Sequence, residues 1–191
     1  QYDYDQLFPV YGFGAKIRDE TQASMCFNVT LTENAYVNGI EGVLNEYHNV
    51  LNNLTFYGPT YFAPIIRTVI NDIREEANSL NYHILMILTD GVINDMNMTI
   101  DCLCEGAKLP LSVIIIGIGK ADFSNMVVLD ADDDPLVDSR GNTCVRDLVQ
   151  FVPFNDYRND PKELAKQVLE EIPRQIVEFY AQNNIYPDNI S

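Results

Sequence analysis

Two uninterrupted apolar runs constrain the fold of this chain more than any other feature. They span residues 84–88 and 113–118, and no polar residue interrupts them. Both have the length of a strand and are far shorter than the roughly 18 apolar residues of a membrane-spanning helix. A strand that is apolar along its whole length is typical of a parallel sheet covered by helices on both faces. We therefore expect strands over 81–88 and 111–118, adjacent and interior in one sheet.

Helical and extended patterns alternate around these two strands. Further strands are expected over 8–14, 25–31, 54–56 and 148–153. Helices are expected over 37–51, 65–73, 95–107, 122–129 and 161–180, with Pro173 kinking or dividing the last one. This alternation predicts an α/β fold with a doubly wound, mostly parallel sheet and helices on both faces. A length of 191 residues suits one domain, expected over 1–191.

The charge of the chain excludes some classes of partner. Lys and Arg total 12 against 28 Asp and Glu, which gives a net charge of -16. A field of this sign repels phosphate backbones and anionic lipid headgroups. We therefore expect no nucleic-acid binding, and membrane attachment only through a bridging cation or another module.

Ligands of doubly wound sheets bind beyond the carboxyl ends of the strands. Asp90 lies just after the expected strand 81–88, in the sequence Thr89-Asp90-Gly91, and Thr60 lies in another loop ahead of a helix. Asp90 followed by Gly91 is also an ordinary turn sequence, and Thr60 is also a suitable helix cap. If both residues reach one edge of the sheet, their hydroxyl and carboxylate oxygens suit Mg²⁺ or Mn²⁺.

No recognisable catalytic pattern accompanies this pair. His48 and His83 stand alone, and neither a Gly-x-Ser-x-Gly nucleophile elbow nor a Gly-x-x-x-x-Gly-Lys-Ser/Thr phosphate loop occurs. The sequence therefore predicts a protein that is not an enzyme.

The four cysteines do not form a zinc framework. Cys102 and Cys104 are separated by one residue, which is closer than the usual spacing of zinc ligands. We expect Cys26, Cys102, Cys104 and Cys144 to be free intracellular thiols.

An acidic loop is expected over 131–142. Its carboxylates are Asp132, Asp133, Asp134 and Asp138, and Asp130 precedes them. An EF-hand is excluded because Pro135 stands where glycine is required and Gly141 where the bidentate glutamate belongs. A solvated acidic loop is the favoured interpretation.

Five segments in order along the chain resemble the copine family. They read FPVYGFGA at 8–15, FYGPTYFAPI at 56–65, ILTDGVI at 87–93, KLPLSVIIIGIG at 108–119 and RDLVQFVPF at 146–154. The last is the most specific, because no general α/β rule requires it. The matched region resembles the copine A domain, a relative of von Willebrand factor A and integrin I domains.

The resemblance implies a metal-ion-dependent adhesion site. In such a site one loop supplies an Asp-x-Ser/Thr-x-Ser cluster, a second a Thr and a third an Asp. Thr60 matches the second loop and Asp90 the third, with Tyr61 and Gly91 beside them as expected partner contacts. The first cluster belongs to a central first strand upstream, which we expect to be missing from residues 1–191. Occupancy by Mg²⁺ or Mn²⁺ therefore depends on residues outside this sequence.

The resemblance also implies a function. Copines carry two calcium-dependent phospholipid-binding modules upstream of this domain, so we expect a cytoplasmic protein recruited to the plasma membrane when calcium rises. This domain would bind intracellular protein partners in membrane trafficking and signalling. Two alternatives remain open: the substrate-binding domain of a copine-like ubiquitin ligase, and a metal-dependent phosphotransferase or hydrolase that uses Asp90.

Overall fold

The computed structural model describes residues 5–76, 80–131 and 134–186. The chain divides into two compact units, Gln1–Ile65 and Ile66–Ser191. The copine-like single domain expected over 1–191 stays a prediction. Among the described residues, no helix has both the length and the apolar character that crossing a bilayer requires.

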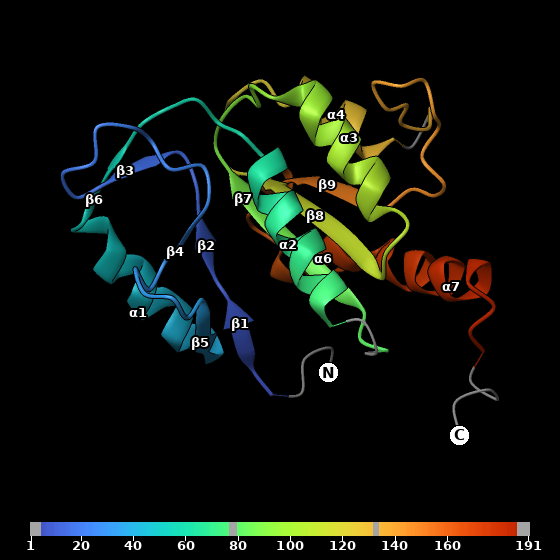
Figure 1. Cartoon of the computed structure of the whole chain (residues 1–191), viewed down its shortest axis with the longest axis horizontal. Coiled ribbons are helices and arrows are strands. Elements are labelled where there is room, and N and C mark those ends of the chain that lie inside the picture. Colours follow the sequence, from blue (N-terminus) through green and yellow to red (C-terminus); the bar gives the residue numbers. More distant parts are fainter. Residues whose placement is uncertain (1–4, 77–79, 132–133, 187–191) are drawn as a thin grey trace. The chain divides into compact units, whose positions relative to one another are not determined.

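A three-stranded parallel sheet forms the centre of the second unit (Figure 1). Its strands, in spatial order, are β7 (His83–Thr89), β8 (Leu111–Gly117) and β9 (Val149–Pro153). Thr89 pairs with Gly117 and Gly117 with Pro153, so the three strands end at one edge. The helices are α2 (Ala63–Glu75), α3 (Met96–Gly106), α4 (Ser124–Asp130), α5 (Phe154–Tyr157), α6 (Pro161–Leu169) and α7 (Ile172–Gln182). The α/β class is confirmed.

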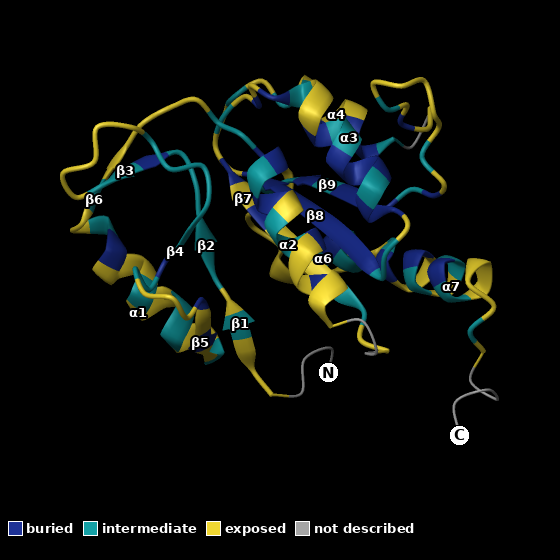
Figure 2. Cartoon of the chain, in the orientation of Figure 1, coloured by how far each residue is buried: buried dark blue, intermediate teal, exposed yellow. Residues whose placement is uncertain are grey.

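Strand β8 is buried along its whole length (Figure 2). On one of its faces, Ile114 and Ile116 form a core with Val168 of α6 and Ile172 of α7. On the other face, α3 comes close to the sheet because Gly106 lacks a side chain: a Cβ there would lie 3.2 Å from Leu111 Cδ2. Helices on both faces explain the unbroken apolar sequence of β8, so the expected interior position of this strand is confirmed.

Strand β7 differs from the expectation. It is adjacent to β8, but it is an edge strand of the sheet among the described residues, as is β9 on the other side. Its side chains alternate, and Ile84, Met86 and Leu88 are 36%, 50% and 54% exposed. The expectation of an interior β7 is therefore wrong for this sheet. An apolar run indicates that a strand can be buried, but it does not show that another strand or helix packs against it.

The terminal helix is divided as expected. Helix α6 ends at Leu169 and α7 begins at Ile172, with Pro173 in its first turn. Proline fits there because the first amides of a helix have no helical acceptor. The Asp160 carboxylate caps the N-terminus of α6. It accepts hydrogen bonds from the backbone amides of Lys162 and Glu163, each at 3.1 Å.

The first unit contains antiparallel pairs of short strands. The strands are β1 (Leu7–Pro9), β2 (Tyr11–Gly12), β3 (Ala15–Ile17), β4 (Phe27–Asn28), β5 (Tyr36–Asn38) and β6 (Leu54–Phe56), and α1 (Gly39–Leu51) precedes β6. Strand β1 pairs with β5, β2 with β4 and β3 with β6. The single strands expected over 8–14 and 25–31 are therefore interrupted or shorter. These six strands do not join the parallel sheet in the described residues.

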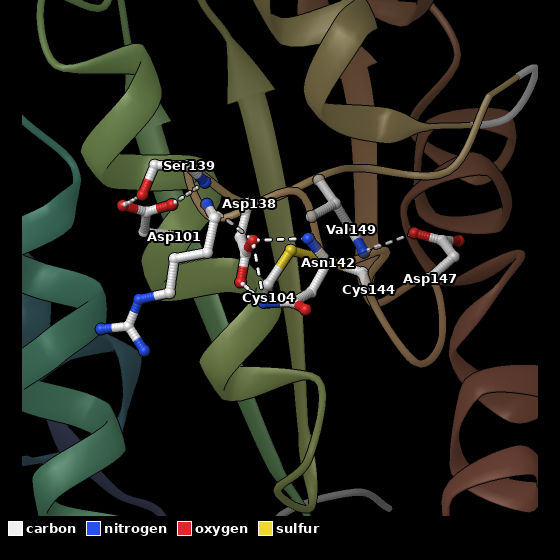
Figure 3. Close-up of a disulfide and its surroundings, with 9 residues drawn as sticks. Asp101, Cys104, Asp138, Ser139, Asn142, Cys144, Asp147 and Val149 are labelled. Atoms are coloured by element: carbon white, nitrogen blue, oxygen red, sulfur yellow. Dashed lines mark hydrogen bonds between the residues drawn. A yellow bond between two sulfur atoms is a disulfide. The ribbon is translucent and has the colours of Figure 1, made fainter.

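The cysteine expectation is wrong for two of the four residues. Cys104 on α3 forms a disulfide with Cys144, and their Cα atoms lie 4.7 Å apart (Figure 3). Cys26 and Cys102 remain thiols. The two bonded residues are 40 positions apart, so only the tertiary structure brings them together.

Candidate functional site at the carboxyl edge of the sheet

Asp90 is the first residue after β7 and is exposed. The preceding Thr89 is buried, and its carbonyl oxygen accepts a hydrogen bond from the Ile118 amide at 2.7 Å. The Thr89 hydroxyl lies 3.4 Å from the Gly91 amide that donates to it. The ends of β7 and β8 are thus held together, and the Asp90 carboxylate lies at the rim that they form.

The rim continues through the turn after β8. A Cβ on Gly117 would lie 3.0 Å from both Phe123 Cζ and Phe151 Cε2, so this position has no room for a side chain. Gly119 has a φ of +97°, which favours glycine. Its carbonyl oxygen accepts a hydrogen bond from Asn155 Nδ2 of α5. The sequence therefore has glycine at both positions, because a side chain would clash at 117 and the positive φ at 119 is unfavourable for other residues.

A second carboxylate lies in the loop after Asp90. Asp95 is the N-cap residue of α3 and is 8% exposed. Its Oδ1 accepts a hydrogen bond from the Thr99 hydroxyl at 3.2 Å, and its carbonyl oxygen accepts one from the Thr99 amide at 2.9 Å. Asp95 was expected only as the first residue of the helix over 95–107, whereas it is the residue that precedes the helix.

Thr60 lies between the cis Gly58–Pro59 peptide and the fully buried Phe62. The Phe62 ring packs edge-on against Phe13 at 5.9 Å between ring centroids, and this contact anchors the end of the loop. Helix α2 begins only at Ala63, so Thr60 is not the residue directly before the helix. Thr60 and Tyr61 belong to the first unit, whereas Asp90 and Gly91 belong to the second. The expected pairing of Thr60 with Asp90 therefore stays a prediction.

The oxygen atoms of Asp90 and Thr60 are of the kind that a hard cation binds. Carboxylate and hydroxyl oxygens are the ligands that Mg²⁺ and Mn²⁺ prefer. In the described parts of the chain, no three or more His, Cys, Asp or Glu side chains come together in a way that could hold a metal. Thr60 and Asp90 would supply two of the six oxygens that Mg²⁺ seeks, so further ligands would have to complete the site.

The two histidines and Asp138 of the acidic loop make contacts with other groups of the protein. His83 Nε2 lies 3.5 Å from Glu76 Oε2, and His48 Nδ1 lies 2.7 Å from the Leu44 carbonyl oxygen. In the acidic loop, Asp138 closes a turn by accepting hydrogen bonds from the side chain and amide of Asn142, which lower the pKa of its carboxyl group. Asp132 and Asp133 lie outside the described residues.

Comparison with known families decides the identity of the chain. The sequence model of the copine family matches residues 1–188. The chain belongs to the copine family. The copine match spans both compact units and includes Thr60, Tyr61, Asp90 and Gly91. The resemblance seen in the five sequence segments is thereby confirmed.

Proposed function

We propose that this copine chain is a non-catalytic interaction domain that binds intracellular protein partners through a divalent cation. The exposed Asp90 carboxylate at the end of β7 carries this proposal. Its position beyond a parallel strand is where open α/β sheets bind ligands. A carboxylate from the partner would complete the coordination of the cation, and Tyr61 and Gly91 would contact that partner.

The cation would be Mg²⁺ or Mn²⁺, held by Asp90 and Thr60 together with an Asp-x-Ser/Thr-x-Ser cluster on a further strand upstream. We expect that strand to pair with β7 and complete a doubly wound sheet of the von Willebrand factor A type. The free outer edge of β7 within the described residues supports this. So do the exposed side chains of Ile84, Met86 and Leu88, which a longer sheet and its helices would cover.

The contacts of the two histidines support a non-catalytic role. His83 lies against Glu76 and His48 against the Leu44 carbonyl oxygen, and neither contact activates a nucleophile. A metal-dependent phosphotransferase or hydrolase that uses Asp90 is the less favoured alternative, because the sequence has no Gly-x-x-x-x-Gly-Lys-Ser/Thr phosphate loop. A substrate-binding domain of a copine-like ubiquitin ligase would use the same edge of the sheet and would differ by a RING module elsewhere in the protein.

Membrane contact would come from other modules of the parent protein. The net charge of -16 opposes direct binding of this chain to anionic lipids. Calcium-dependent phospholipid-binding modules upstream would recruit the protein from the cytoplasm to the plasma membrane, where this domain would select its partners.

Calorimetric titration of Mg²⁺ and Mn²⁺ tests the site. We expect weak binding to residues 1–191 and at least about tenfold tighter binding to a chain extended upstream through the Asp-x-Ser/Thr-x-Ser strand, since Mg²⁺ seeks six oxygens. In the extended chain, Asp90→Ala and Thr60→Val should weaken binding, whereas Asp19→Ala, at another exposed carboxylate, should leave it unchanged. Unchanged affinity after Asp90→Ala would contradict the proposal.

A further inference from the structure

The disulfide joins a buried position on a helix to an exposed connection. Cys104 lies on α3 and is 6% exposed. Cys144 is half-buried and lies in residues 134–145, which we call the tethered segment (Figure 3). The segment is part of the connection from α4 to β9, and the bond fastens it to the side of α3. Of the two bonded cysteines, Cys144 is the more exposed residue.

Non-covalent contacts also hold the tethered segment. The Asp101 carboxylate on α3 accepts hydrogen bonds from the Ser139 amide at 2.7 Å and from the Ser139 hydroxyl at 2.8 Å. The Cys144 amide donates to the Leu136 carbonyl oxygen at 2.8 Å, and the Leu136 side chain is buried. These contacts do not need the disulfide. Breaking the bond would therefore loosen the segment without removing every contact that docks it.

A partly open pocket adjoins the segment. It has a volume of about 170 Å³, and Leu136, Cys144, Arg146 and Leu148 are among the residues that line it. The space beside these side chains gives them room to move. Val137 and Val145 are more than half exposed, whereas Leu136 is buried. The buried Arg146, which follows the segment, anchors the chain at that end.

A third cysteine lies nearby but faces elsewhere. Cys102 is two residues before Cys104 on α3, which turns it about 200° around the helix. It is fully buried, and its sulfur accepts a hydrogen bond from Arg67 Nη2 at 3.2 Å. Burial raises the pKa of the Cys102 thiol, which leaves little of the reactive thiolate. Cys102 is thus not placed to exchange with the disulfide, so the bond responds to external thiols.

We propose that the Cys104–Cys144 bond is a reversible redox tether that controls the mobility of residues 134–145. The proposal uses the cytoplasmic location proposed above, because disulfides in reducing compartments are usually transient or redox-sensing. It does not depend on the cation site at Asp90.

The reaction requires a dithiol reductant. One thiolate of the dithiol attacks the Cys144 sulfur, the sulfur–sulfur bond breaks, and Cys104 leaves as a thiolate that takes up a proton. The second thiol of the reductant then attacks the reductant sulfur that is bonded to Cys144. This step releases Cys144 as a thiolate, which takes up a proton. Two electrons and two protons pass to the cysteine pair, and the dithiol becomes a disulfide. Exchange with an external disulfide reverses the process.

Two measurements on the native chain test the tether, with dithiothreitol as the dithiol. After incubation without denaturant, alkylation and mass spectrometry should find both Cys104 and Cys144 modified. Trypsin should then cleave after the exposed Arg140 at least about tenfold faster, because local opening controls proteolysis. Circular dichroism should show unchanged helix content. Excess oxidised glutathione should restore the slow cleavage.

Matched variants complete the test. Cys144→Ser should be cleaved rapidly with or without dithiothreitol, whereas Cys26→Ser should keep the redox response. The proposal is overturned if the bond resists dithiothreitol until denaturant is added, if reduction leaves cleavage at Arg140 unchanged, or if reduction unfolds the chain. The metal titration measures a separate property, so a failure of the proposed function would leave these outcomes unaffected.

Discussion

Arg146 donates a hydrogen bond from Nε to the carbonyl oxygen of Ala107 at 2.9 Å. Ala107 is the C-cap residue of α3, where carbonyl groups lack helical donors. The Nη2 atom of the same guanidinium lies 2.8 Å from the Leu109 carbonyl oxygen and 2.6 Å from that of Leu111. One side chain therefore joins the end of α3, the following turn and the start of β8. Burial lowers the pKa of the Arg146 guanidinium.

Arg146→Lys should destabilise the chain by about 3 kcal/mol, because an ammonium group cannot replace the forked donors and would leave buried carbonyl groups unpaired. Urea denaturation followed by circular dichroism measures this change. The exposed Arg140 offers a matched control, and Arg140→Lys should change the free energy of unfolding by less than about 0.5 kcal/mol. Equal effects of the two substitutions would show that the Arg146 contacts contribute little.

Ser112 and Gln175 form a buried polar pair between β8 and α7. The Ser112 hydroxyl donates to Gln175 Oε1 at 2.6 Å, and both residues are fully buried. Ser112→Ala should cost about 1–3 kcal/mol, because it leaves the amide oxygen of Gln175 without this donor. A double-mutant cycle with Gln175→Leu should give a coupling energy of about 1 kcal/mol or more. Additive effects of the two substitutions would argue against a direct interaction.

The disulfide should stabilise the oxidised chain by constraining the unfolded state. It joins residues 40 positions apart, and a loop of this length corresponds to about 4 kcal/mol in the chain-entropy description. Replacing both Cys104 and Cys144 by alanine should therefore lower the free energy of unfolding by about 4 kcal/mol. Dithiothreitol should lower the stability of the unmodified chain to a similar level and leave the variant unchanged. A variant as stable as the oxidised chain would refute this expectation.

The turn closed by Asp138 should loosen in acid. Hydrogen bonds from the side chain and amide of Asn142, aided by the Arg140 amide, lower the pKa of Asp138 below its ordinary value of 3.8. A depressed carboxyl pKa means that the contribution to stability is complete above the ordinary value and is lost as pH falls through the folded value. Amide exchange protection at Asn142 should therefore decrease in that range.

The matched control for this pH effect is a neighbouring carboxylate. Asp138→Asn should remove the pH dependence of protection at Asn142, whereas Asp134→Asn should preserve it, because the structure shows no role for Asp134 in this turn. The same acid response in the Asp138→Asn variant would assign the effect to another group.

The sequence alone indicated the sheet and the helices that border it. The apolar run of β8 requires cover on both faces, and α6 and α7 supply it on one of them. The break at Pro173 also followed from local chemistry, because proline removes an amide donor and ends the preceding helix. The five copine-like segments identified the family, and the match over 1–188 agrees with them.

Tertiary structure decided which distant residues meet. The bond between Cys104 and Cys144 has no local signature, because it depends on how α3 and the segment before β9 fold against each other. The Arg146 contacts with Ala107 and Leu111 arise in the same way. Strand β7 has an apolar sequence like that of β8, but one of its faces is exposed. The two strands differ because β8 has a neighbouring strand on each side in the described sheet, whereas β7 has one on a single side. A sequence determines the apolar and polar character of each side chain, whereas burial and pairing depend on which other segments occupy the surrounding space.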